Sequence, residues 1–310
     1  MKRGITCTVQ KEDAGRLLKH FLKTPMGLSE KEIRRAKFRE DGLRVNGQRR
    51  KTNALLREGD RIEVLLETGE ETSSRLSASR FPLEILYEDA DLLAVNKPSG
   101  LKTHPNGRDG EDTLANRLAA YLREKGEDSV IRIAGRLDRD TSGAVLAVKN
   151  RAAGARLARQ RERGDFFKTY LAVVKGVPRE PCAWIRTSIG ADPERRGRMK
   201  ISENGKTAAT WYEVVDGCKE YALLRLRIET GRTHQIRVHL ASIGCPLLGD
   251  SLYGGEEAGW ADGVRPIIGR TALHAARLSF SQPFTGERIE VEAPLPADMG
   301  KFLLQDGISL

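Results

Sequence analysis

The sequence predicts an α+β protein in which a small basic module precedes a larger domain. Residues 1–68 carry +7 of the net charge of +10, because they contain 17 Lys or Arg and 10 Asp or Glu. Residues 69–80 are rich in serine and poor in large apolar side chains, which is typical of a flexible linker. Residues 81–310 mix alternating apolar strands with amphipathic helices, and this pattern predicts the larger domain.

The basic module is predicted to form two short helices and a small hairpin. Apolar residues recur at helical spacing over residues 17–22, and Ser29 with Glu32 forms a capping box for a second helix. Residues 43–47 predict a strand and turn, and residues 59–64 a turn and strand. Basic side chains, among them Arg34, Arg35, Lys37 and Arg39, lie along the second helix and at its end.

This order of elements resembles the S-four-type (alpha-L) RNA-binding domain. The resemblance implies that Arg34, Arg35 and Lys37 bind RNA phosphates. Such contacts would make binding sensitive to salt and largely independent of base sequence. The aromatic content of 5% argues against an extended platform for base stacking.

The larger domain opens with two predicted strands, at residues 83–89 and 91–96, and Pro98 ends the second. Residues 113–124 carry leucine at every fourth position, and Thr113 is a suitable N-cap, so an amphipathic helix is expected there.

Residues 151–164 predict another helix, and residues 166–174 alternate as a strand that places Lys168 and Tyr170 on one face. A further strand is expected at residues 221–228. It leads into a predicted helix that Thr233 can cap. His234 and His239 stand five residues apart and do not share a helix face, so no metal site is expected.

The most informative run is G-R-L-D-R-D-T-S-G at residues 135–143. Asp138 stands between Arg136 and Arg139 in the sequence, and nearby positive charge favours an ionised carboxylate. An Asp followed by Thr, Ser and Gly also occurs in ordinary turns, where the side chains cap local amides. The run alone leaves both interpretations open.

Several segments together resemble the RluA/RluD family of pseudouridine synthases, of the ribosomal large-subunit type. In chain order they are N-K-P-S-G at residues 96–100, R-L-D-R-D-T-S-G at 136–143, K-T-Y-L-A-V-V at 168–174, G-R-T-H-Q-I-R-V-H at 231–239, G-D-S-L-Y-G at 249–254 and L-H-A at 273–275. The last two are expected to support packing. One departure is Gly135, where histidine is common in the family.

The resemblance implies a long, mixed, mostly antiparallel sheet flanked by helices, and the isomerisation of uridine to pseudouridine in RNA. Large-subunit ribosomal RNA is the expected substrate, with transfer RNA as an alternative. Asp138 would attack the sugar or the base, or take a sugar proton, and Arg237 would pair with it. Tyr170 would lie against the base, and Arg136 would fill the gap left by the extruded nucleotide. Lys97 is assigned to substrate binding, with a structural role left open.

This reaction involves no redox change, so neither a cofactor nor a metal is expected. The sequence agrees, since it has no P-loop and no G-x-G-x-x-G in a strand-to-helix turn. The four cysteines are far apart and the N-terminus lacks an apolar signal, which favours a cytoplasmic protein with reduced thiols. No apolar run approaches membrane-spanning length, so no membrane partner is expected, and the protein is expected to be a monomer.

Two other classes of function remain open from the sequence. A noncatalytic RNA-binding or ribosome-assembly protein would use the same basic module. A glycosidase would use Asp138 and Asp140 as its paired carboxylates. The position of Asp140 in a turn and the low aromatic content disfavour the glycosidase.

Overall fold

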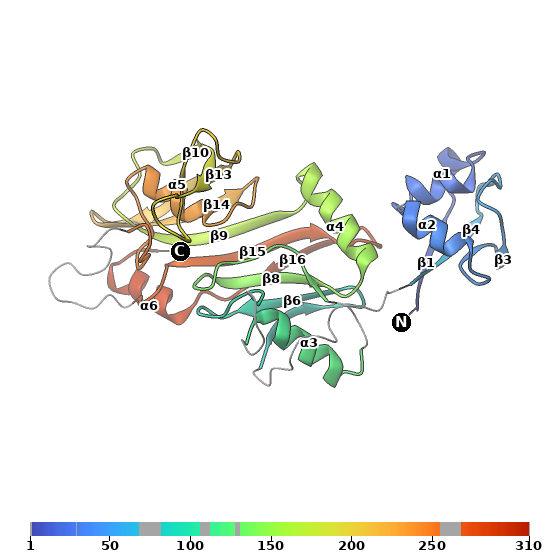
Figure 1. The fold of residues 1–310 in the computed structure, drawn as a ribbon, viewed down its shortest axis with the longest axis horizontal. Helices are drawn as coiled ribbons and strands as arrows, with labels where there is room; N and C mark the ends of the chain where they lie inside the picture. The colour runs from blue at the N-terminus through green and yellow to red at the C-terminus, as the bar shows by residue number, and fades with distance from the viewer. Residues whose placement is uncertain are drawn as a thin grey trace.

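A computed structural model describes residues 2–28, 30–67, 82–105, 112–127, 131–254 and 268–309 (Figure 1). The predicted linker at residues 69–80 and the predicted cap Ser29 lie outside the described residues. No helix within these ranges is both long enough and apolar enough to cross a lipid bilayer.

The N-terminal residues build a four-stranded sheet with two helices. The elements are β1 (Lys2–Thr8), η1 (Lys11–Asp13), α1 (Leu18–Lys23), α2 (Glu30–Lys37), β2 (Leu43–Val45), β3 (Gln48–Arg49) and β4 (Arg61–Glu67). The strand order is β1-β4-β2-β3, with antiparallel neighbours. Asn46 and Gly47 both have positive φ, which allows the tight turn between β2 and β3. Buried Leu18, Phe21 and Ile62 are part of one apolar cluster that joins α1 to the sheet.

The larger unit is built on a ten-stranded mixed sheet. Its strands are β5 (Glu84–Glu88), β6 (Leu92–Lys97), β7 (Arg132–Ile133), β8 (Ser142–Val148), β9 (Phe167–Lys175), β10 (Cys182–Arg186), β13 (Ala209–Gly217), β14 (Tyr221–Ile228), β15 (Leu273–Ser281) and β16 (Arg288–Glu292). The order is β10-β13-β14-β9-β15-β8-β6-β5, with β16 beside β15 and β7 beside β8. Only β15 and β8 pair in parallel within the described sheet. The predicted α+β fold with a long, mostly antiparallel sheet is confirmed. A separate pair, β11 (Ile189–Ala191) and β12 (Met199–Ile201), lies off this sheet.

Four helices accompany the large sheet: α3 (Leu114–Glu124), α4 (Arg151–Arg163), α5 (Gln235–Ser242) and α6 (Ala297–Gln305). The side chain of Thr113 accepts a hydrogen bond from the Asn116 backbone, which confirms the predicted cap of α3. Gly164 ends α4 at φ 78°, in the left-handed region that glycine favours. The predicted cap of α5 is wrong: His234, at φ 53°, is the N-cap, and its side chain makes no capping bond.

The two faces of the sheet bury different helices, because successive strand residues point to opposite sides. On β6, Leu93 belongs to the cluster that includes residues of α3 and α5, whereas Leu92 belongs to the cluster that includes α4. Helix α6 packs in a third cluster with Val173 of β9. Every residue of β8 is buried, which makes β8 a rigid central strand directly after the Asp138 loop.

The N-terminal unit contacts the larger one through α4. The guanidinium groups of Arg156 and Arg159 donate hydrogen bonds to the backbone carbonyls of Met26 and Gly27, the second at 2.7 Å. Ala152, on the same helix, packs into the apolar cluster of the N-terminal unit. Helix α4 is therefore shared by both units.

Candidate active site

Asp138 lies on the loop that joins β7 to β8. The loop closes on itself, since the Thr141 amide donates to the Asp138 carbonyl at 3.2 Å. Leu137 points inward and is 4% exposed, while the Asp138 side chain keeps 19% of its surface exposed. The loop is thus anchored by an apolar side chain and presents a carboxylate to solvent.

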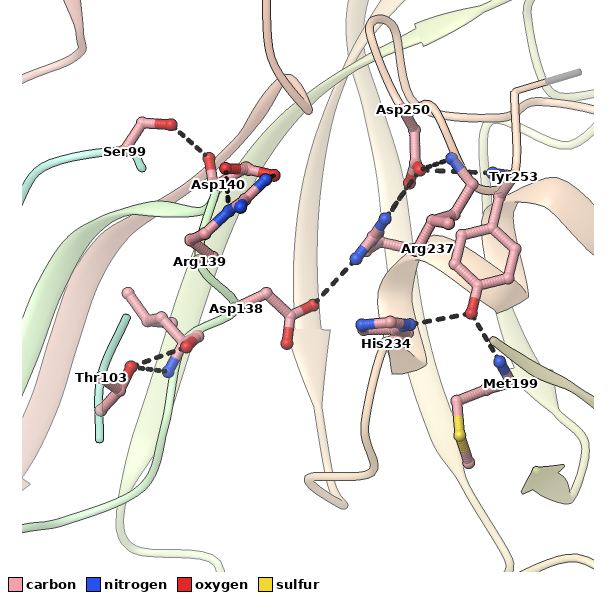
Figure 2. Close-up of polar contacts among 12 residues, drawn as sticks. Ser99, Thr103, Asp138, Arg139, Asp140, Met199, His234, Arg237, Asp250 and Tyr253 are labelled. Carbon is pink, nitrogen blue, oxygen red and sulfur yellow. Dashed lines mark hydrogen bonds and ion pairs between the residues drawn. The ribbon is translucent and has the colours of Figure 1, made fainter. Parts of the chain in front are cut away.

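The segment that follows β6 fixes the backbone of this loop. Thr103 Oγ1 donates to the Leu137 carbonyl at 2.7 Å and accepts from the Leu137 amide at 3.3 Å. Ser99 Oγ donates to the Asp140 carbonyl at 2.8 Å (Figure 2). Two motifs that are distant in the sequence, residues 96–100 and 136–143, therefore form one structural unit.

Lys97 is fully buried beneath the loop. Its ammonium donates to the carbonyls of Pro98 at 2.9 Å, Leu101 at 2.8 Å and Arg139 at 2.9 Å. Burial lowers the pKa of Lys97 to about 7, opposed by the charges of the nearby Asp140 and Asp138 carboxylates. The assignment of Lys97 to substrate binding is corrected, because its ammonium has no exposed surface and instead holds the loop together.

The Asp138 carboxylate faces Arg237, a residue of α5. Arg237 NH1 lies 3.6 Å from Asp138 Oδ2, and Figure 2 shows the two side chains pointing toward each other. The structure therefore brings together the aspartate and the arginine that the sequence motifs paired.

A second carboxylate, Asp250, holds the other side of the Arg237 guanidinium. Asp250 is fully buried and accepts from Arg237 Nε at 2.7 Å and from NH2 at 2.8 Å. Its Oδ1 also accepts from the amides of Leu252 at 3.0 Å and Tyr253 at 3.3 Å. Sequence reasoning gave the G-D-S-L-Y-G turn a packing role only, although a charged residue in such a turn could have suggested an ion-pair partner.

Tyr253 extends this network to His234. Its hydroxyl accepts from the Met199 amide at 2.8 Å and lies 2.9 Å from His234 Nδ1. Burial lowers the pKa of His234, which favours the neutral imidazole, and its Nδ1 can then accept a hydrogen bond from the Tyr253 hydroxyl. The ring of Tyr253 lies 5.1 Å from the Arg237 guanidinium carbon. Tyr253 thus links Arg237 to His234, which lies beside the Asp138 carboxylate in Figure 2.

Tyr170 lies on the central strand β9 and is 4% exposed. Burial, and then the charge of Asp138, raises the pKa of its hydroxyl well above the usual value. The phenol therefore keeps its proton at neutral pH and can donate a hydrogen bond.

The two arginines beside Asp138 in the sequence have different positions in the structure. Arg136 is exposed, and Arg139 pairs with Asp140, with Arg139 Nε 3.1 Å from Asp140 Oδ1. The cationic partner of Asp138 is therefore Arg237 rather than Arg139.

The remaining candidate residues lie elsewhere. Arg34, Arg35 and Lys37 are exposed on α2, in the N-terminal unit and apart from β8 (Figure 1). His239 is buried, with Nδ1 2.9 Å from Thr210 Oγ1 and Nε2 3.2 Å from the Thr187 carbonyl, and these contacts are structural. Within the described part of the chain, no group of three or more His, Cys, Asp or Glu is placed to hold a metal ion.

A loop carboxylate beside a guanidinium, at the centre of a long mixed sheet, defines an enzyme-like site, and the chain is similar to known enzymes. Residues 91–242 match the family model described as RNA pseudouridylate synthase. The chain is 38% identical over 299 residues to the uncharacterized RNA pseudouridine synthase YhcT of Bacillus subtilis, which covers 96% of this chain and 95% of that protein. It is also 38% identical over 252 residues to ribosomal large subunit pseudouridine synthase D of Vibrio cholerae, which covers 79% and 77% of the two chains.

A solved structure agrees on the fold. Human RNA pseudouridylate synthase domain containing 4 superposes with a TM-score of 0.61 at 23% identity, over 73% of this chain and 94% of that one. The chain belongs to the RluA/RluD family of RNA pseudouridine synthases and is an isomerase that acts on RNA.

Proposed function

We propose that this enzyme converts specific uridines of large-subunit ribosomal RNA to pseudouridine, with Asp138 as the nucleophile and without a cofactor. The substrate class is supported by relatives named ribosomal large subunit pseudouridine synthase D in Vibrio and Haemophilus. The observation that carries the catalytic assignment is the Asp138 carboxylate, partly exposed on a fixed loop and 3.6 Å from Arg237 NH1.

The reaction is a rearrangement of one nucleoside. The bond from the sugar carbon C1′ to uracil N1 breaks, the base turns, and a bond from C1′ to C5 forms. The proton on C5 leaves and N1 gains one, so atoms and electrons balance without an oxidant or an energy source. Asp138 can start this sequence by attack on the sugar, by attack on the base, or by taking a sugar proton.

Three other residues have proposed roles around the reacting base. Arg237 orients the Asp138 carboxylate and is itself held by Asp250. Tyr170, protonated at neutral pH, contacts the uracil as a hydrogen-bond donor. A stacked base is out of reach of these groups, so the nucleotide is extruded at a cost of about a few kcal/mol. Exposed Arg136 would fill the space that it leaves.

The N-terminal unit is proposed to be an S-four-type RNA-binding domain. Its helix α2 presents Arg34, Arg35 and Lys37 to solvent, where they can bind RNA phosphates. We further propose that the enzyme works as a monomer in the cytoplasm.

The test compares pseudouridine maps of cellular RNA with and without the gene, followed by complementation with variants. We expect one or a few ribosomal pseudouridines to disappear and Asp138→Asn not to restore them, with a rate loss of about 10³-fold or more in vitro. Asp140→Asn is the matched control, since the Asp140 carboxylate pairs with Arg139 on the same loop and should retain most activity.

Two results would contradict the proposal. An unchanged pseudouridine map after gene deletion would show that the enzyme does not modify ribosomal RNA in the cell. Full modification by Asp138→Asn would exclude this residue as the nucleophile. Full growth together with an unchanged pseudouridine map for Asp138→Asn would favour the noncatalytic RNA-binding or ribosome-assembly function instead.

A further inference from the structure

A cavity of about 310 Å³ lies between α4 and the β7–β8 pair, on the side of the sheet that carries α4. Part of its lining is apolar and includes Val148, Leu157 and Phe166. The rest includes three arginines, Arg132, Arg151 and Arg161. None of these residues belongs to the Asp138, Arg237 and Asp250 network.

The arginines of the cavity lack carboxylate partners within the described residues. The structure shows no ion pair for Arg132, Arg151 or Arg161 there, and the buried Nε of Arg151 has no hydrogen-bond partner. Burial, and then the charge of Arg151, lowers the pKa of Arg132, yet a guanidinium remains charged at neutral pH. Arg132 and Arg151 are half-buried, whereas Arg161 is exposed. Like charges that are half-buried are costly without an anion. Their arrangement therefore indicates a site for an anionic group.

A fourth cation stands at the end of the cavity nearest the Asp138 loop. Gly135 lines the cavity at φ 98°, and a Cβ built there would lie 3.0 Å from Lys168 Nζ and 3.2 Å from Arg161 NH2. Burial, and then the charge of Arg161, lowers the pKa of Lys168 to about 8, so the ammonium is mostly charged at pH 7. A side chain at position 135 would crowd these two cations, and glycine avoids that contact.

We propose that this cavity binds one nucleotide of the RNA substrate outside the reacting one, with its phosphodiester on Arg132, Arg151 and Arg161. This inference rests on the proposed function. Guanidinium groups match phosphate oxygens in a two-pronged geometry, and the apolar lining suits a sugar or the face of a base. The volume is at the lower end of the range of about 300–1,000 Å³ for small-ligand sites, which fits a single nucleotide.

The position of the cavity favours an RNA chain over a free anion. One stripe of α4, with Arg156 and Arg159, binds the N-terminal unit, while Arg151 and Arg161 of the same helix line the cavity. At its other end the cavity reaches Gly135, three residues before Asp138. A strand of RNA that contacts both the N-terminal unit and the Asp138 loop would pass along this helix.

The test uses the full chain and an unmodified transcript of large-subunit ribosomal RNA. Arg132→Gln, Arg151→Gln and the double variant are compared with Arg277→Gln, which also removes one charge but from an arginine that pairs with Glu290 and Glu292. Binding is measured as a function of salt, and KM and kcat are measured separately.

For each cavity variant we expect Kd and KM to rise about tenfold and kcat to stay within about twofold of the wild type. The slope of log Kd against log salt should fall by about one, which corresponds to the loss of one phosphate contact. Arg132→Lys should keep the salt dependence, because it keeps the charge. Melting temperatures of the cavity variants should be equal to or above that of the wild type, since a half-buried charge without a carboxylate partner is removed. Arg277→Gln should leave Kd and the salt dependence unchanged.

Unchanged Kd and salt dependence in the double variant would overturn the inference. A second result would also overturn it: inorganic phosphate or uridine monophosphate stabilises the wild type but not the double variant, and the two bind RNA with equal affinity. The cavity would then be a site for free anions. A wild type that binds the transcript but forms no pseudouridine would contradict the proposed function. The binding data for the variants would still test whether the cavity contacts RNA.

Discussion

Asp250 binds two nitrogens of the Arg237 guanidinium and leaves the third, NH1, facing Asp138. The bonds from Arg237 to Asp250 measure 2.7 and 2.8 Å, and the contact from NH1 to Asp138 measures 3.6 Å. A fully buried carboxylate therefore sets the position of the arginine that faces the proposed nucleophile. We propose that Asp250 is a positioning residue whose effect on the rate acts through Arg237.

Asp250→Asn is expected to lower kcat about 10- to 100-fold with little change in KM, because Arg237 loses its charged anchor. Removal of one partner of a buried pair also lowers the free energy of unfolding, here by about 3 kcal/mol or less, since asparagine still accepts one hydrogen bond. Single-turnover kinetics and urea unfolding measure the two effects.

Asp112→Asn is the control for that variant. It weakens a similar carboxylate–guanidinium pair with Arg117, which is more exposed: the Arg117 side chain is 14% exposed and that of Asp112 is 29% exposed. The free energy of unfolding should fall by about 1 kcal/mol or less, without a change in kcat. An Asp250→Asn enzyme with the wild-type kcat would show that Arg237 needs no anchor.

Thr103→Val removes the hydroxyl that holds both backbone groups of Leu137. Valine has nearly the same shape, so the change leaves the buried Leu137 carbonyl and amide without these bonds and should cost about 1–3 kcal/mol. Because Asp138 is the next residue, kcat should also fall, by about tenfold. Thermal melting and kcat are the measurements. Thr285→Val, in an exposed turn, is the control. Equal effects of the two changes would show that Thr103 has no specific role in holding the Leu137 backbone.

Lys97 predicts a pH dependence of stability. Its pKa is about 7 in the folded enzyme and about 10.4 in an unfolded chain. Between these values the unfolded state binds more protons, so the contribution of Lys97 to the unfolding free energy increases with pH and is flat below about pH 7. The stability of the wild type relative to Lys97→Met should therefore rise from pH 7 to pH 9.

Urea unfolding at pH 6, 7, 8 and 9 measures this difference. Lys19→Met, which removes an exposed lysine of the N-terminal unit, controls for the loss of one charge. A difference between wild type and Lys97→Met that is the same at all four pH values would show that the buried ammonium does not release its proton in the folded enzyme.

Local sequence patterns predicted the elements whose signals lie within a few residues. Helix α3 follows the leucine spacing and its Thr113 cap, and α4 ends at Gly164. Strand β1 has no counterpart in the prediction, because it is partly polar and pairs with β4 about sixty residues away. Thr233 was a reasonable cap by residue type, but the left-handed backbone of His234 starts α5 one residue later.

The sequence predicted the residues of the candidate site that would contact the substrate, but not the residues that hold them in place. The Asp138 and Arg237 motifs indicated a carboxylate and a guanidinium, which the structure brings together. Nothing within the N-K-P-S-G segment shows that the Lys97 ammonium will meet the Arg139 carbonyl, 42 residues later. Asp250 likewise stands in a turn, and its partner Arg237 becomes evident only once α5 is in place.

The basic helix α2 predicts how the N-terminal unit contributes to RNA affinity. Arg34, Arg35 and Lys37 are exposed there, and changing all three to glutamine should weaken RNA binding and lower the slope of log Kd against log salt by about 2–3, near 0.7–0.9 for each lost phosphate contact.

At saturating RNA the kcat of this triple variant should be unchanged, because α2 lies apart from β8 and the Asp138 loop. The matched control removes three other arginines, each paired with a glutamate in the larger unit: Arg186, Arg225 and Arg277. Filter binding between about 50 and 200 mM salt separates the two triple variants. If the RNA affinity and the slope of log Kd against log salt fall equally in both triple variants, RNA binding depends on the overall charge and not on α2 in particular. A larger loss for the α2 variant means that the N-terminal unit is an anchor with its own contacts to RNA.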